Sequence, residues 1–557
     1  MRSKLLIRLL LLWITLAVSL LYLSAQGPAF EWAKKIGKTN KYSGGNSNTL
    51  DYSGNIITAG SEGDSSFIVK QNTGGTVLWK IKLNATAVSI TTDATGNIYS
   101  IGNFTGTQDF DPGGNTTTLS ASGNTDIYIL KLDASGNFAW AKAISGNETE
   151  NPDAITIDVK GNIIISGAYT GTVDFDPGSS TISKTAVGSY DMFILKLSPA
   201  GNYNWVQSLG SSDYEYISGV TTDRNRNIIF GSFLVASVDY DPGSNTDIKT
   251  ANGMGDFCIT KFDSSGNYVW CKHFGSTQND ALTSLVADSS DNIYSTGYFQ
   301  QTLDFDPGTG TVNVTPLGSR SLFVLKLDGS GNYSWVKYFG EAYIYSSSIT
   351  LDKNKALYIT GSFSDTVDFD PGTGTVYAYV NQGANYKRDS LDIFILKLNQ
   401  SGNFDWVKTM GGPGMDNGVD IAVDMAGSVF TTGYFSSMTD FNTDSGILAL
   451  KPTGRYDGFI HKLSNPSSGL KPMWKYNTNC IVYPNPGKGQ FNIVLPNQGK
   501  NADIAVYNSL GVLVLSNHFN QETIIDLGNM ANGIYYITIT QAINGRSVMN
   551  TIPVIKQ

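Results

Sequence analysis

Three short sequence patterns each recur seven times, always in the same order, between residues 30 and 463. The first is a tryptophan, and its copies are Trp32, Trp79, Trp140, Trp205, Trp270, Trp335 and Trp406. The second is a run similar to Asp-Val-Lys-Gly-Asn-Ile-Ile, and its copies start at Asp51, Asp93, Asp158, Asp223, Asp288, Asp352 and Asp424. The third is a run similar to Asp-Met-Phe-Ile-Leu-Lys-Leu, and its copies centre on Phe67, Tyr128, Phe193, Phe257, Phe323, Phe394 and Phe459. A unit repeated this often restricts the chain to a repeat architecture, because neighbouring copies bury equivalent surfaces against one another.

Each repeat predicts four β-strands. In the copy that follows Trp140 they are expected at 154–158, 162–166, 192–197 and 203–208, where Val, Ile, Phe and Tyr dominate. Gly-Asn pairs separate several of these segments and favour tight turns. No helical period stands out beyond the first 25 residues. Four-stranded units that repeat radially form a β-propeller.

The two ends of the repeat region are complementary. The repeats begin with a tryptophan strand at 31–36 that has no earlier partner, and they end at Leu463 with no tryptophan strand after it. The first strand can therefore complete the last sheet, which leaves no unpaired edge at the join. We expect an all-β, seven-bladed propeller over residues 26–463, closed by its N-terminal strand. The alternative is an open stack of sheets.

The ordered repeat is similar to that of a known family. Runs such as Asp93-Ala-Thr-Gly-Asn-Ile-Tyr, followed by Asp-x-Phe-Ile-x-Lys-Leu, Gly-Asn and Trp, resemble the bacterial secreted β-propeller (SBBP) repeat. The resemblance covers about residues 30–463. It implies a propeller fold and an extracellular setting, and it implies no single activity.

The first 25 residues have the order of a secretory signal peptide. Arg2, Lys4 and Arg8 form a basic start, residues 5–23 are mostly apolar, and Ser24 and Ala25 are small. A membrane anchor is the alternative, because the apolar run is long. No later segment is apolar enough to span a bilayer, so no transmembrane span is expected in the mature chain.

The C-terminal part of the chain departs from the repeat. Residues 464–479 are expected to form a linker, and 480–557 a small β-sandwich of the immunoglobulin-like type. The segments Tyr483-Pro-Asn-Pro486 and Asn532-Gly-Ile-Tyr535 and the basic end resemble the type A C-terminal sorting domain of type IX secretion in the Bacteroidota. The resemblance implies the type IX machinery as a partner and passage through the periplasm. It implies a secreted or outer-surface location, with release or surface attachment left open, and removal of the domain. The alternative is an adhesive or carbohydrate-binding sandwich that is retained.

Five repeats carry an acidic insert, Asp-aromatic-Asp-Pro-Gly, between the second and third strands. The Asp residues are Asp109, Asp111, Asp174, Asp176, Asp239, Asp241, Asp304, Asp306, Asp368 and Asp370. The first repeat lacks the insert, and the seventh has the altered form Asp440-Phe441-Asn442. Paired carboxylates are hard oxygen ligands, so these ten residues are candidates for binding Ca²⁺. The alternative is structural, with carboxylates that bond backbone N–H groups of a turn and an aromatic side chain that packs inward.

Several other features allow two interpretations. The tryptophans are expected to pack between blades, and stacking on sugars is the alternative. The repeated Lys of the third pattern is expected to have a solvated head with its stem along the sheet. Cys258 and Cys271 lie on one hairpin, and free buried thiols or a disulfide would both fit. A symmetric turn would place them opposite each other, and a shift of one residue would send them to opposite faces.

Composition restricts the function more than it specifies it. The net charge of −9 argues against binding nucleic acid. Only His273, His461 and His518 are present, and no metalloprotease, phosphate-loop or nucleophile-elbow motif occurs. We therefore expect a binding or adhesion module for glycan or protein ligands, with a secreted polysaccharide hydrolase or lyase and a surface spacer as alternatives. The divergent loops 214–218, 341–348 and 378–390, and the seam between the last and first blades, are the first places to search for a site.

Overall fold

The structure is a computed structural model. It describes residues 27–37, 42–63, 65–340, 342–381, 390–444, 446–464, 481–483, 487–494, 502–508, 513–519, 522–543 and 546–556. The predicted signal peptide and almost all of the predicted linker lie outside the described residues. The chain divides into two compact units, Met1–Asn465 and Pro466–Gln557, and each is described by itself. No helix among the described residues is long and apolar enough to cross a membrane.

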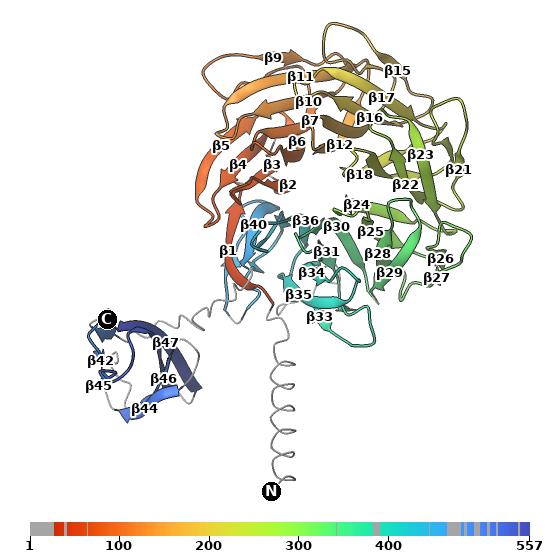
Figure 1. The fold of residues 1–557 in the computed structure, drawn as a ribbon. Coiled ribbons are helices and arrows are strands. Elements are labelled where there is room, and N and C mark those ends of the chain that lie inside the picture. The colour runs from red at the N-terminus through yellow and green to blue at the C-terminus, as the bar shows by residue number, and fades with distance from the viewer. Residues whose placement is uncertain are drawn as a thin grey trace. The chain divides into compact units, whose positions relative to one another are not determined.

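The described part of the first unit forms seven antiparallel sheets arranged in a ring, which we call blades 1 to 7 (Figure 1). Each blade has four strands, and the sheet of blade 2 continues from its outermost strand into two further short strands, at 172–174 and 183–185. From the inner to the outer strand, blade 1 has β2 (Ser43–Leu50), β3 (Ile56–Glu62), β4 (Ser65–Gln71) and β5 (Val77–Leu83); blade 2 has β6 (Thr86–Thr92), β7 (Ile98–Phe104), β10 (Asp126–Leu132) and β11 (Phe138–Gly146). Blade 3 has β12 (Glu150–Ile157), β13 (Ile163–Tyr169), β16 (Asp191–Leu197) and β17 (Tyr203–Leu209); blade 4 has β18 (Tyr216–Thr222), β19 (Ile228–Leu234), β22 (Asp256–Phe262) and β23 (Tyr268–Phe274); blade 5 has β24 (Ala281–Ala287), β25 (Ile293–Phe299), β28 (Ser321–Leu327) and β29 (Tyr333–Phe339). Blade 6 has β30 (Ile344–Leu351), β31 (Leu357–Phe363), β34 (Asp392–Leu398) and β35 (Phe404–Met410); blade 7 has β36 (Asp416–Val423), β37 (Val429–Phe435), β40 (Asp457–Ser464) and β1 (Ala29–Ile36).

The position of a strand in its blade follows from its side chains. Second and third strands are buried along their whole length, as in β13 and β16 of blade 3, because sheets cover both of their faces. First strands are richer in small polar residues, as in β2, and each contacts the first strands of the two neighbouring blades. The first strands therefore line the centre of the ring, and the apolar cores lie between adjacent blades.

The N-terminal strand closes the ring as predicted. In blade 7, β1 pairs with β40, with Phe30 opposite Leu463 and Trp32 opposite Lys462. Gly27, just before β1, lies against the Trp406 side chain. It occupies the place that a turn glycine has in the other blades.

The repeated tryptophans pack between blades, which confirms the packing interpretation. Each indole lies against the glycine in the last turn of the following blade. Trp205, for example, lies against Gly266, whose φ is +86°. A Cβ at that glycine would lie 2.9 Å from the indole. Glycine is required there twice over, by the positive φ and by the close approach of the ring.

The prediction that the repeated lysines have solvated heads is wrong for four of them. Lys70, Lys196, Lys261 and Lys462 are buried. Lys196 Nζ lies 3.3 Å from Asp158 Oδ2 and donates to the Ser264 carbonyl of the next blade at 3.0 Å. The other three lysines of the pattern lie over tyrosine rings on the second strand, as Lys131 does over Tyr99 at 4.8 Å. The tyrosine occupies the space through which a lysine otherwise reaches the carboxylate.

The acidic inserts form two-stranded ribbons between the second and third strands, which we call the insert ribbons. They are β8 (Thr107–Asp109) with β9 (Thr118–Ser120), β14 (Thr172–Asp174) with β15 (Ser183–Thr185), β20 (Ser237–Asp239) with β21 (Ile248–Thr250), β26 (Leu303–Asp304) with β27 (Asn313–Val314), β32 (Thr366–Asp368) with β33 (Tyr377–Tyr379), and β38 (Thr439–Asp440) with β39 (Ala449–Leu450). The labelled ribbon strands lie toward the periphery of the ring (Figure 1).

Cys258 and Cys271 are both free and buried. Cys258 lies opposite His273 and Cys271 opposite Thr260, because the register of β22 and β23 shifts between Lys261 and Phe262. The two thiols are thus diagonal neighbours on one face of the hairpin. Neither register considered from the sequence, direct opposition or opposite faces, is the one observed.

The described part of the second unit contains two antiparallel sheets that share one apolar core. The first sheet has β41 (Ile481–Tyr483), β42 (Gln490–Val494) and β45 (Glu522–Asp526). The second has β43 (Ala502–Asn508), β44 (Leu513–Phe519), β46 (Gly533–Ile543) and β47 (Arg546–Lys556). Phe491 and Ile525 of the first sheet pack with Val506 and Ile537 of the second. This is the packing of a β-sandwich, and the immunoglobulin-like topology stays a prediction.

Candidate ligand-binding site

The insert ribbons use their carboxylates to hold their own backbone. Asp174 Oδ1 accepts hydrogen bonds from the N–H groups of Asp176, at 3.1 Å, and Ile182, at 2.8 Å. Asp176 Oδ1 accepts from the N–H of Gly178 at 2.8 Å. The same bonds recur at Asp109 and Asp111, Asp239 and Asp241, Asp304 and Asp306, and Asp368 and Asp370. Asp440, in the altered copy, also bonds the N–H groups two and eight residues on.

The aromatic residue of each insert packs inward, as the structural interpretation expects. Phe175 is fully buried, 5.3 Å from the Tyr169 ring and 5.0 Å from the Phe193 ring, measured between centroids. In the part of the chain that the structure describes, no group of three or more His, Cys, Asp or Glu side chains could hold a metal ion. The donor set therefore fits a turn better than a calcium shell, and calcium binding stays a prediction.

A second repeated set of carboxyl groups lies where one blade meets the next. Third strands begin with Asp in several blades, and the following first strand has an acid at or just before its start. Glu150 faces Asp126 in this way, and burial, followed by the Asp126 charge, raises the pKa of Glu150 to about 8. Burial likewise raises the pKa of Asp392 to about 7 and that of Asp416 to about 6. These groups are fully or almost fully buried, so they belong to the blade interfaces.

The face that carries the insert ribbons also holds a group of tyrosines that occurs in some of the blades and not in others. It consists of Tyr42, Tyr214, Tyr216, Tyr298, Tyr343, Tyr345, Tyr434 and Tyr456, which we call the tyrosine rim. Its members lie at or near the starts of first strands, the ends of second strands or the start of the third strand β40. In an up-and-down sheet these strand ends share one edge, which is also the edge where the inserts begin. Because most of them belong to first or second strands, the rim lies along the mouth of the ring's centre, on blades 1, 4, 5, 6 and 7.

At the seam between blades 7 and 1, three rim tyrosines contact one another. The Tyr42 ring lies 6.1 Å from Tyr434 and 5.6 Å from Tyr456, and the last two are 5.4 Å apart. The Arg455 guanidinium lies 5.6 Å from the Tyr456 ring. Tyr42 is 48% exposed, so this cluster is accessible to a ligand.

In blades 5 and 6 the rim is organised around an arginine. The Arg320 guanidinium lies 3.9 Å from the Tyr298 ring and 5.4 Å from the Tyr343 ring, both within cation–π range. Tyr298 also lies 6.2 Å from Tyr345. Tyr343 is 43% exposed. The arginine holds the rings in place and leaves their outer faces free.

In blade 4 the rim borders a pocket. Tyr214 and Tyr216 stack on Phe233 with centroids 6.3 Å and 5.0 Å away. Burial, followed by the nearby Tyr298 and Tyr345, raises the pKa of the Tyr216 phenol. The pocket has a volume of about 430 Å³, and its lining includes Asp153 and Glu215.

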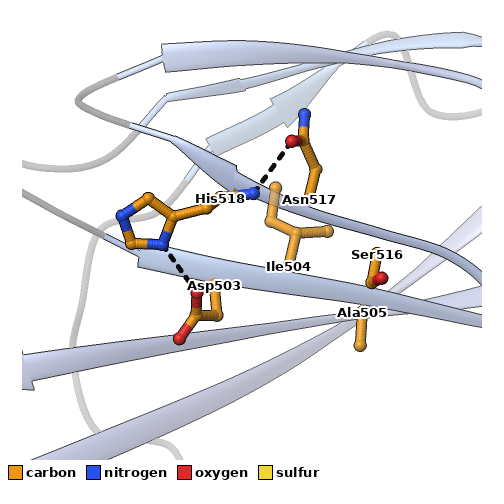
Figure 2. Close-up of a pocket in the computed structure, with 6 residues that line it drawn as sticks. All are labelled: Asp503, Ile504, Ala505, Ser516, Asn517 and His518. Carbon is orange, nitrogen blue, oxygen red and sulfur yellow. Dashed lines mark hydrogen bonds and ion pairs between the residues drawn. The ribbon is translucent and has the colours of Figure 1, made fainter.

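The three histidines do not form a site together. His273 Nε2 lies 2.7 Å from Asp256 Oδ2, and burial lowers the pKa of His461 to about 3. His518 belongs to the second unit, where its Nδ1 lies 2.6 Å from Asp503 Oδ1 across β43 and β44 (Figure 2). Both side chains are more than half exposed, so the hollow beside them is an open strand surface rather than an enclosed pocket.

Two of the three loops chosen from the sequence contribute to this site. Residues 214–218 supply Tyr214 and Tyr216, and residues 341–348 supply Tyr343 and Tyr345. Most of the third loop, at 382–389, lies outside the described residues. The seam between the last and first blades supplies Tyr42, Tyr434 and Tyr456. The rim was not identified from the sequence, although tyrosines that recur in only some of the repeats, such as Tyr42, Tyr214 and Tyr343, were a visible signal.

Comparisons with known proteins find a family match in the second unit and distant relatives over longer parts of the chain. Residues 481–552 match the family model of the secretion system C-terminal sorting domain. An uncharacterised WD repeat-containing protein of Acanthamoeba polyphaga mimivirus is 24% identical over 456 residues, which are 67% of this chain and 32% of that protein. A regulatory protein of Caulobacter vibrioides is 20% identical over 207 residues, 35% of this chain and 21% of that protein. The chain thus spans a third or less of the length of these two relatives.

Among solved structures, virginiamycin B lyase from Staphylococcus aureus covers 77% of this chain with 99% of its own, at 12% identity and a TM-score of 0.38. A likeness this distant indicates no activity. The sorting-domain match confirms the resemblance seen at residues 480–557, and no comparison tests the resemblance to the SBBP repeat. The match of residues 481–552 to the secretion system C-terminal sorting domain therefore marks this propeller protein for type IX export to the cell surface or the extracellular space.

Proposed function

We propose that the exported ring binds an oligosaccharide through the tyrosine rim. The observation that carries this proposal is the set of partly exposed tyrosines along one mouth of the ring, on blades 1, 4, 5, 6 and 7. A tyrosine offers an apolar face, which stacks on the C–H face of a sugar ring, and a hydroxyl that exchanges hydrogen bonds with sugar hydroxyls. Its side chain has few rotatable bonds, so little entropy is lost when a ligand binds.

The repeated features of the ring support this assignment by elimination. The tryptophans pack between blades, and the insert carboxylates accept hydrogen bonds from backbone N–H groups, so neither set is available to a ligand. The rim, in contrast, departs from the repeat and retains exposed rings, such as Tyr42 and Tyr343. Aromatic residues that stay exposed beside a pocket are typical of a binding surface.

Binding is favoured over hydrolysis by the state of the two carboxyl groups in the blade 4 pocket. A glycoside hydrolase uses two carboxyl groups that both reach the substrate. Glu215 is 1% exposed, and both of its oxygens contact Ser211, one through the backbone N–H at 3.0 Å and the other through the hydroxyl. Only Asp153 retains a carboxyl oxygen without a hydrogen-bond partner.

The test compares exposed tyrosines on the two faces of the ring. Isothermal titration of the full-length protein with a panel of neutral hexasaccharides would identify one that binds. Tyr343→Ala and Tyr42→Ala should each weaken its binding about tenfold, which is about 1.4 kcal/mol. Tyr52→Ala is the matched control, because Tyr52 is 94% exposed but lies in the turn between β2 and β3, at the opposite edge of blade 1. Equal affinity in the wild-type protein and all three variants, or no binding of any saccharide, would contradict the proposal. Either result would favour the alternative that the ring is a surface spacer.

A further inference from the structure

The pocket beside the rim lies where blade 3 meets blade 4. Its lining includes Asp153, Glu215, Tyr190, Tyr214 and Tyr216, and none of its lining residues is Lys or Arg. The Glu215 N–H donates a hydrogen bond of 3.1 Å to the Tyr190 carbonyl, which joins the segments before β18 and β16. Backbone pairing therefore fixes the tyrosines and the acids relative to one another.

Asp153 has an unsatisfied oxygen in this pocket. Its Oδ2 is buried and has no hydrogen-bond partner. Burial raises the pKa of Asp153 to about 7, and the opposing effect of the Ile217 N–H is smaller. A buried carboxyl oxygen without a partner costs free energy, which a bound group that donates hydrogen bonds or carries positive charge would recover.

The surroundings of Asp153 favour an organic cation over a metal ion. Three tyrosines line the pocket, and aromatic rings around a cation stabilise ammonium groups. A metal ion would require several oxygen ligands, whereas Glu215 is already held by Ser211. The volume of about 430 Å³ is large enough for a sugar ring and far larger than a bare ion needs.

We infer that the pocket binds the ammonium group of an unacetylated amino sugar, so that the tyrosine rim prefers glycans with free amino groups. The inference rests on the proposed function, because Tyr214 and Tyr216 belong to both the rim and the pocket. The sugar stacks on the rim, and its amino group lies in the pocket beside the carboxyl group of Asp153, a residue of the pocket lining. A lysine side chain carries the same ammonium chemistry, so a lysine-containing peptide is included in the test.

The test changes the ligand before it changes the protein. The full-length wild-type protein is titrated at pH 7 with hexamers of glucosamine, N-acetylglucosamine and glucose, and with a hexalysine peptide. We expect the glucosamine hexamer to bind at least tenfold more tightly than either other hexasaccharide. Acetylation removes the charge and leaves the sugar backbone unchanged, so this comparison does not depend on any variant folding.

Two protein variants then test whether Asp153 is responsible for the preference for the glucosamine hexamer. Asp153→Asn keeps the shape of the side chain and should abolish the preference for glucosamine, while the affinity for glucose hexamer stays within twofold. Asp213→Asn is the matched control, because Asp213 is an exposed acid in the same loop that does not line the pocket. It should retain the preference, and thermal melting should show that both variants fold.

The outcomes separate this inference from the proposed function. A rim that binds all three hexasaccharides equally, or an unchanged preference in Asp153→Asn, would overturn the inference and leave the proposed function intact. Binding of hexalysine alone, lost in Asp153→Asn, would overturn the amino-sugar assignment in favour of a protein ligand. Binding of none of these probes would overturn both.

Discussion

The insert ribbons and the tyrosine rim lie on the same face of the ring, but the ribbons stabilise their own turns, whereas the rim keeps side chains exposed. In the ribbons each carboxylate is satisfied by nearby N–H groups, as Asp174 is by Asp176 and Ile182, and the aromatic residue is buried. The rim uses side chains of blades 1, 4, 5, 6 and 7 only, and several of its rings remain exposed. The difference teaches that conspicuous repeated residues in this chain maintain the ring, whereas departures from the repeat are candidates for binding.

The largest stability effect is expected in the ribbons. Asp174→Ala removes the acceptor of two backbone N–H groups and should lower the free energy of unfolding by about 1–3 kcal/mol. Asp174→Asn retains an oxygen acceptor and should cost less than half as much. Urea denaturation of the three proteins, with and without Ca²⁺, measures both effects.

The same variants decide between the structural and the calcium interpretations. If the ribbons only hold their turns, Ca²⁺ and a chelator should leave all three unfolding midpoints unchanged. If the ribbons bind calcium, Asp174→Asn should be as damaging as Asp174→Ala, and Ca²⁺ should stabilise the wild-type protein more than either variant. Oligosaccharide binding should not change in either variant, because no ribbon residue belongs to the rim.

A smaller effect is expected from pH at the blade interfaces. The pKa of Glu150 in the folded protein is raised from 4.5 to about 8, so its contribution to stability is fully present below pH 4.5 and is lost as the pH rises through 8. The melting temperature should therefore be higher at pH 5 than at pH 9, with about 2–4 °C arising from this residue. Glu150→Gln cannot ionise and should reduce the difference. A melting temperature that rises with pH, or a difference that is the same in Glu150→Gln, would show that this carboxyl has no such role.

Much of the fold could be predicted from the sequence, because its elements repeat with regular spacing. The pairing of the Trp32 strand with the segment that ends at Leu463 followed from the two unmatched ends of the repeat. The burial of Lys196 was not predicted, because it depends on whether the second strand offers Ile164 or a tyrosine opposite the lysine, and that requires the register. The positions of Cys258 and Cys271 were missed for a related reason, a register shift between neighbouring strands.

The candidate site was only partly visible in the sequence. The loops that supply Tyr214 and Tyr343 stood out because they depart from the repeat. Their position on the same mouth as Tyr42 and Tyr456 could not be predicted, because closing the ring is what brings residues more than a hundred positions apart to one mouth. The burial and raised pKa of Asp153 could not be predicted either, since they depend on how blade 4 packs against blade 3.

Hydrogen–deuterium exchange of the full-length protein, with and without the tightest-binding hexasaccharide, tests most directly whether function resides in the rim. We predict slower exchange in the peptides that contain Tyr42, residues 214–218 and residues 343–347, and unchanged exchange in the insert ribbons. Protection confined to the ribbons, or no protection on either, would contradict the assignment of binding to the tyrosine rim.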